Sequence, residues 1–140
     1  MTIQELLKEQ ANFMEYQLNA VFKDIPEEKG DATVAGQFSP RQTLQHLCEC
    51  YVAYLAYTEG KEHEWGTYQP ADTSLDALRT EMKRLRDQMH EKAYSSNNDD
   101  FVLKALDFGV VHDSYHVGQM VTWRLNVTPD FSPYSIYPGH

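Results

Sequence analysis

Basic residues and long apolar runs are scarce in this chain, and each shortage excludes a class of partner. The 12 Lys and Arg residues are outnumbered by 21 Asp and Glu residues, which leaves a formal net charge of −9. Such a charge repels a phosphate backbone, which nucleic-acid-binding proteins meet with clustered basic residues. The longest apolar run, residues 51–57, is far shorter than the ~20 residues that span a membrane. We therefore expect neither nucleic acid nor a membrane as a partner.

Cysteines are also few, and their positions indicate whether the protein works in an oxidising or a reducing compartment. Cys48 and Cys50 would point to nearly opposite sides of a helix, so a disulfide between them is implausible. Glu5 and Glu9 occupy the region where a secretory signal would be basic and then apolar. The sequence therefore predicts a soluble protein of the reducing cytoplasm. Its 140 residues fit one domain with one core, over residues 1–140.

Helix-start signals occur twice in the first third of the chain. Thr2 with Glu5, and Ser39 with Gln42, have the spacing of a capping box. Apolar residues at three- and four-residue spacing follow both signals and recur twice later. Four helices are therefore predicted, over residues 3–22, 40–57, 73–94 and 100–126. No hairpin turn flanked by alternating apolar residues competes with them.

The lengths of the connections predict how the helices are arranged. The break at residues 95–99 is short and forces antiparallel neighbours, whereas residues 23–38 and residues 58–72 are each numerous enough to cross a bundle. We place the crossover at residues 58–72. We therefore expect an all-α four-helix bundle of up-down-down-up topology. The tail at residues 127–140 combines prolines with aromatic side chains, and we expect it to pack back on the bundle.

Three histidines form a candidate metal site. His112 and His116 are four residues apart, so on one helix face both rings can reach a single ion. His46 would be costly to bury without a partner, and in an antiparallel arrangement it lies within about one turn of the depth of His116. Three imidazoles on one side of an ion leave a position open, as in catalytic zinc sites. The alternative is a pair of histidines without function, one at the core edge and one solvated.

A zinc-protease interpretation of the same stretch fails. Residues 112–116 read HDSYH, in which aspartate occupies the position of the general base in the pattern H-E-x-x-H. The chain also lacks the longer H-x-x-G-x-x-H continuation.

The other three histidines are expected to be solvated. His63 lies in a charged loop, His90 lies among charges near the end of the third helix, and His140 is the last residue. The loop around His63 could also fold over the mouth of the site.

The histidine motifs resemble those of a known family. The second predicted helix contains His46 in the stretch HLCE, and the last contains HDSYHVGQ from His112 to Gln119. A helix-two histidine followed by H-x-x-x-H-x-G-Q on the last long helix is the mark of the DinB/YfiT-like family, and the resemblance covers nearly the whole chain. It implies a four-helix bundle, commonly a homodimer, in which His46, His112 and His116 hold a divalent transition metal. Relatives include S-transferases for low-molecular-weight thiols and thiol-dependent isomerases.

The sequence thus predicts a metal-dependent enzyme, with zinc or nickel, that acts on a small molecule, and the resemblance implies a low-molecular-weight thiol as a second substrate. Two alternatives stay open. One is a metal-binding protein without turnover, such as a sensor or a bundle with a structural ion. The other is a hydrolase that activates water. A concave, partly apolar cavity over the ion would favour an enzyme, whereas a sealed site would favour a structural ion. No catalytic side chain can be assigned.

Several neighbours of the ligands have two interpretations each. Gln119 could hydrogen-bond a ligand ring or be a polar residue between helices. Glu49 could orient His46 or be an ordinary surface residue. Cys50 could be a fourth, soft ligand or pack as a small apolar group. Gly118 is expected to allow a close approach of another helix.

Two basic residues could help at the mouth of the site. The acidic surface disfavours an anionic thiol unless Arg41 or Arg124 lies there. Trp123 could also line the mouth, with core packing as its default role.

Overall fold

In the computed structural model, which describes residues 1–139, both predicted capping boxes form. The Thr2 hydroxyl accepts from the Glu5 amide at 3.1 Å, and the Glu5 carboxylate accepts from the Thr2 amide at 2.8 Å. Ser39 and Gln42 make the same exchange at 3.2 and 2.9 Å. Each pair satisfies amides that lack a partner at a helix start. These boxes open helices α1 (Ile3–Phe22) and α2 (Pro40–Thr58).

The third helix begins two residues later than predicted. Helix α3 (Leu75–Tyr94) starts after Ser74, whose hydroxyl accepts from the Ala77 amide at 3.2 Å, so Ser74 is the cap and Thr73 is not. Short 3-10 turns lie in the first connection (Glu27–Lys29) and in the tail (Pro133–Ile136).

The fourth predicted helix exists, but it is not uniformly α-helical. Helix α4 (Asp99–Leu106) continues into a π-helical segment (Asp107–Val111) and then into α5 (His112–Val127). The amide of His112 donates to the carbonyl of Asp107, five residues earlier. This wider turn is a π-bulge, a feature often found at functional sites. It lies directly before the first histidine of the candidate motif.

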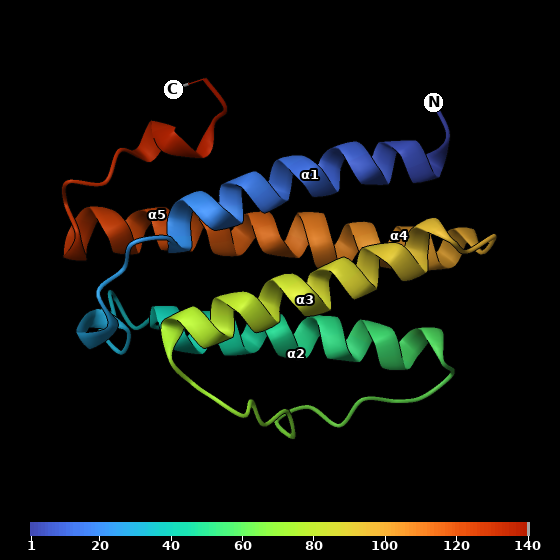
Figure 1. The fold of residues 1–140 in the computed structure, drawn as a ribbon, viewed down its shortest axis with the longest axis horizontal. Helices are drawn as coiled ribbons and strands as arrows, with labels where there is room; N and C mark the ends of the chain where they lie inside the picture. The colour runs from blue at the N-terminus through green and yellow to red at the C-terminus, as the bar shows by residue number, and fades with distance from the viewer. Residues whose placement is uncertain (140) are drawn as a thin grey trace.

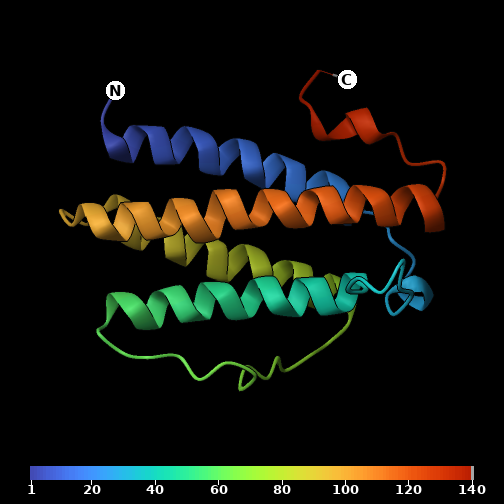
Figure 2. The same cartoon turned by 180° about the vertical axis from the view of Figure 1, so that it is seen from behind.

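The helices form a four-helix bundle, so the predicted fold class is confirmed. In Figure 1, α1 runs from right to left, α2 and α3 run from left to right, and α4 with α5 returns from right to left. The connection between α2 and α3 runs back along the length of the bundle. Seen from behind, α2 and α5 lie side by side (Figure 2). No helix within residues 1–139 is long and apolar enough to cross a membrane.

The apolar faces of all the helices meet in one core. Phe131 and Ile136 of the tail pack against it, and the tail turns back beside α1 (Figure 1). The largest fully buried side chains of this core are Tyr51, Tyr54, Phe22, Leu7, Leu18, Leu44, Leu47, Leu78, Met89 and Met120.

Two glycines in the continuous helix formed by α4, the π-helical segment and α5 differ in their surroundings. A Cβ on Gly109 would lie 2.6 Å from Met89 Cε and 2.8 Å from His90 Cε1. The π-helical segment therefore needs glycine to approach α3. A Cβ on Gly118 would meet nothing within 4 Å. The expected role of Gly118 in a close helix approach is wrong, because its position faces open space.

We expect Gly109→Ala to lower the free energy of unfolding by about 1–3 kcal/mol through overpacking. The matched change Gly118→Ala should raise it by about 0.5–1 kcal/mol, because alanine favours a helix and nothing crowds it. Urea unfolding followed by circular dichroism measures both. Equal effects at the two positions would contradict the close packing around Gly109.

Candidate metal centre

The three predicted histidines come together between α2 and α5. His46 Nε2 lies 3.1 Å from His112 Nε2, and His116 Nε2 lies 3.1 Å from the same atom. All three donor atoms lie within 4.8 Å of one another. The helix spacing that aligns His112 with His116 is thus joined by the antiparallel packing that presents His46 from the opposite side.

This donor set fits a divalent transition metal ion, so the cluster could hold one. Nitrogens bound at about 2.0–2.1 Å in a tetrahedral zinc site are about 3.3–3.4 Å apart. The separations of 3.1 Å in this cluster are close to that value. Imidazole suits zinc, nickel, copper and iron alike, so the donor set does not select among these metals.

The surroundings keep two of the three rings in the neutral form that binds metal. Burial, and then the charges of His112 and His46, lower the pKa of His116 to about 4. Burial and His112 also lower the pKa of His46. Because a protonated imidazole cannot be a ligand, both shifts extend metal binding toward lower pH.

The ring of His116 is held from its far side by Gln119. His116 Nδ1 lies 2.8 Å from Gln119 Oε1, and the Gln119 amide donates to the Tyr115 hydroxyl at 3.0 Å. Such a contact to the nitrogen opposite the metal fixes the tautomer and orientation of a ligand ring. Of the two interpretations of Gln119, the hydrogen bond to the ring is the one that the structure has.

A hollow of about 460 Å³ opens over the three rings. The Phe38 ring contacts His46 edge-on at 5.7 Å between centroids, and the Tyr115 ring contacts His116 at 5.1 Å. The cluster is therefore reached from a concave, partly aromatic surface. The hollow is lined by Gly36, Gln37, Phe38, His46, His112, Tyr115, His116 and Gln119.

Comparison with known protein families agrees with this geometry. The family model described as DinB superfamily matches residues 10–120, a span that includes all three histidines. The chain belongs to the DinB superfamily. The family resemblance seen in the motifs is thereby confirmed. The comparisons with curated proteins and with solved structures gave no match.

A buried ion pair lies behind the histidines of this DinB protein. Asp113 is fully buried, and its Oδ2 accepts from the Tyr51 hydroxyl at 2.7 Å and from Arg86 Nε at 3.2 Å. Arg86 also donates to the carbonyls of Ala11 and Gly109, at 3.2 and 3.0 Å. Sequence reasoning considered Asp113 only as a poor replacement for a protease glutamate. The burial of Arg86 could have been recognised from its spacing. It lies four residues after Met82, on the same face of α3.

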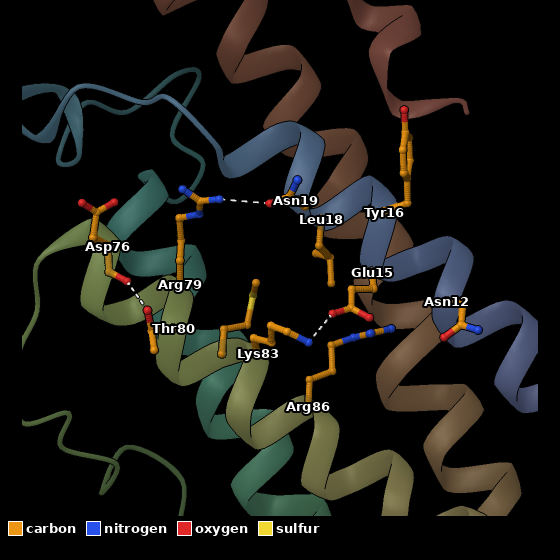
Figure 3. Close-up of a pocket in the computed structure, with 11 residues that line it drawn as sticks. Asn12, Glu15, Tyr16, Leu18, Asn19, Asp76, Arg79, Thr80, Lys83 and Arg86 are labelled. Carbon is orange, nitrogen blue, oxygen red and sulfur yellow. Dashed lines mark hydrogen bonds and ion pairs between the residues drawn. The ribbon is translucent and has the colours of Figure 1, made fainter. Parts of the chain in front are cut away.

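A larger hollow, of about 680 Å³, lies elsewhere, between α1 and α3 (Figure 3). Lys83 pairs with Glu15, and Arg79 donates to Asn19, so two contacts bridge these helices. None of the three histidines lines it.

Glu49 and Cys50 both differ from simple surface residues. The Glu49 carboxylate accepts from the backbone amides of Gly66 and Tyr68, at 2.6 and 3.2 Å, so it holds the connection between α2 and α3. These hydrogen bonds go to the connection and not to the His46 ring, on which Glu49 acts only through its charge. Cys50 is buried, and its Sγ lies 3.7 Å from His46 Nε2, outside the group of donors within 4.8 Å of one another. Burial raises its pKa to about 12, which fits the small apolar role.

The two arginines that could have attracted an anionic thiol at the mouth are engaged elsewhere. Arg41 binds Glu27 and Asp31, each at 2.8 Å. Arg124 is buried and donates to the carbonyls of Val21 and Lys23 at the end of α1, at 3.2 and 2.7 Å.

Trp123 is a core residue. It is buried, and its indole nitrogen donates to the Ala32 carbonyl at 2.8 Å.

Two of the histidines predicted to be solvated are not. The His63 side chain is 10% exposed, packs against the Trp65 ring, and lies 3.5 Å from Glu49. His90 is buried, stacks on Tyr94, and within residues 1–139 neither of its ring nitrogens has a hydrogen-bond partner. These predictions fail because the connection folds onto α2 and because the π-helical segment covers α3. His140 lies outside the described residues.

The buried His90 should make stability depend on pH. Burial, reinforced by the charge of Arg86, lowers its pKa to about 3, so the native state stays neutral where the unfolded chain takes up a proton. Stability is then complete above the unfolded pKa of about 6.5 and falls toward pH 3. Between pH 7 and pH 5, His90→Leu should lose about 2 kcal/mol less stability than the unmodified protein. Urea unfolding at both pH values measures this, and parallel losses in the two proteins would refute it.

Proposed function

We propose that this DinB protein is a metal-dependent enzyme that transfers a low-molecular-weight thiol to a small electrophile. The observation that supports the proposal is the hollow over the three Nε2 atoms, since a purely structural metal site is normally closed by protein ligands. When bound, a divalent ion such as zinc or nickel lowers the pKa of a thiol or of water and makes it a nucleophile at neutral pH. The family resemblance favours thiol, and water would make the protein a hydrolase instead.

Different residues would bind the metal, orient a ligand ring and contact the substrate. His46, His112 and His116 hold the ion through Nε2, and Gln119 fixes the ring of His116. Phe38 offers an aromatic surface on one side of the hollow, and Tyr115 offers one on the other. The amides of Gln37 and Gln119 provide uncharged hydrogen-bonding groups at its edge.

The lining also indicates the charge of the substrates. Within residues 1–139, no Lys, Arg, Asp or Glu side chain lines the hollow. Arg41 and Arg124 are engaged with other partners. A chain with a net charge of −9 and no cation at the site gives an anionic molecule little attraction. We therefore assign an uncharged thiol and an uncharged electrophile. The two free cysteines, both buried, fit a reducing cytoplasm as the place of action.

Alanine substitution tests the ligands. In protein purified without a nickel column, His46→Ala, His112→Ala and His116→Ala should each lose most of the bound metal, because two histidines make a weak site. The matched control is His63→Ala, which removes a histidine beside Glu49 and outside the cluster, and which should keep its metal. Elemental analysis gives the stoichiometry. Full occupancy in His46→Ala would refute the proposed site.

The same protein, substituted with cobalt, tests the open position. Adding 2-mercaptoethanol should produce a sulfur-to-cobalt charge-transfer band, because a thiolate is a good ligand for a borderline-soft metal. If neither this thiol nor a small anion such as azide changes the spectrum, the ion is structural and the non-catalytic alternative is the better one.

We further propose that two copies associate through the outward face of α5. Residues 114–123 contain no Lys, Arg, Asp or Glu, while Val111 is 66% and Leu125 is 45% exposed. An uncharged face with exposed apolar side chains is typical of an interface between copies. Tyr115, on the same helix, also lines the hollow, so a second copy would border the site.

Sedimentation at micromolar concentration should show a particle of twice 16.2 kDa. The double change Val111→Glu/Leu125→Glu should dissociate it, because it places charge in an apolar interface. Leu6→Glu, a change at an exposed leucine of α1, is the control and should leave the dimer intact. A single 16.2 kDa species in the unmodified protein would contradict the dimer.

A further inference from the structure

Two buried polar atoms beside the histidine cluster face each other without a hydrogen bond. They are Nδ1 of His112 and Oδ1 of Asp113, which lie 3.8 Å apart. Within residues 1–139, neither atom has another hydrogen-bond partner. Buried polar atoms without a partner are rare, because each has lost its hydrogen bonds to water and gained none in return. Both atoms can be satisfied by one bond between them.

The orientation of the Asp113 carboxylate is already fixed by its other oxygen. Oδ2 accepts from the Tyr51 hydroxyl and from Arg86 Nε. These two donors come from α2 and α3, so the carboxylate is held between three helices. Oδ1 is therefore held in a fixed position, 3.8 Å from the His112 Nδ1 atom.

The orientation of the His112 ring supplies that donor. Its Nε2 faces the Nε2 atoms of His46 and His116, which leaves Nδ1 on the side of Asp113. A neutral imidazole whose Nε2 binds a metal carries its proton on Nδ1. A movement of about 1 Å would bring Nδ1–H within hydrogen-bond distance of Oδ1.

From these contacts we propose that Asp113 is a positioning residue for His112: its Oδ1 accepts the Nδ1 proton, fixes the tautomer that presents Nε2, and makes that nitrogen more basic. The proposal rests on the metal site proposed above. His116 provides a comparison within the same cluster, because its Nδ1 has the neutral amide of Gln119 as a partner. The two histidines of one motif thus differ in the charge of the group behind them, and carboxylate partners raise ligand basicity.

The first measurement is metal affinity, by competition with a chromophoric chelator. Asp113→Asn should weaken zinc binding by about 10–100-fold. Because this change leaves Arg86 unpaired in the core, a loss of structure could imitate the effect. A matched pair in the background Arg86→Met avoids this. Asp113→Asn and Asp113→Leu are then both neutral and similar in size, and only asparagine offers an oxygen to His112. The leucine variant should bind zinc at least tenfold more weakly than the asparagine variant.

The second measurement separates positioning from structural support. In cobalt-loaded protein, the ring N–H protons of ligand histidines give proton resonances far outside the normal range, and these exchange with solvent. Gln119→Ala should increase the exchange rate of one of them, which assigns His116. Asp113→Leu with Arg86→Met should increase the rate of a different one, that of His112, by tenfold or more and leave the His116 resonance in place. Tyr51→Phe removes one of the two hydrogen bonds to Oδ2 and keeps that from Arg86, so it should raise the exchange rate of the His112 proton far less than tenfold and leave that of His116 unchanged.

The outcomes separate this inference from the proposed function. If the unmodified protein binds neither zinc nor cobalt, the metal site itself is wrong. If it binds both, and the asparagine and leucine variants have equal affinity and equal exchange rates, the metal site stands and the role of Asp113 is refuted.

Discussion

The buried ion pair between Arg86 and Asp113 is the interaction on which both the bundle and the histidine cluster depend. Arg86 comes from α3 and Asp113 from α5, and the same guanidinium binds carbonyls of α1 and of the π-helical segment. Tyr51 adds a hydrogen bond from α2. Taking two charges out of water is costly, and it is offset only when nearly every donor and acceptor is satisfied. All helices must therefore take one relative position for this pair to form.

The same constraint positions the histidines. Asp113 follows His112 directly, so the helix that carries the carboxylate into the core also places the first ligand beside it. The π-helical turn before His112 and the glycine within it let this rod approach α3 closely enough for Arg86 to reach Gly109. The interior of the bundle and the cluster at its edge are thus parts of one polar network, in which the fold determines the direction of each ring.

Membership in the DinB superfamily indicates the fold of this chain but not its reaction, because one fold can serve many reactions. The reaction depends on the residues around the histidine cluster. The distinguishing local feature is an uncharged, aromatic hollow on a strongly acidic protein. Phe38 and Tyr115 come from segments that are far apart in sequence, and both line this hollow. In the proposed enzyme, the choice of substrate would therefore depend on tertiary neighbours that surround a short histidine motif.

Local patterns in the sequence determined the helices and the three histidines. Capping boxes depend on residues three apart, and the His112–His116 pair depends on residues four apart, so both can be recognised without the fold. The tertiary structure alone decided which other polar groups are buried. Arg86, His90 and Glu49 look like solvated charges in sequence, yet each is enclosed by a segment distant along the chain. The physical reason is that the cost of burying a polar group depends on its partners, and those partners are brought together only by packing.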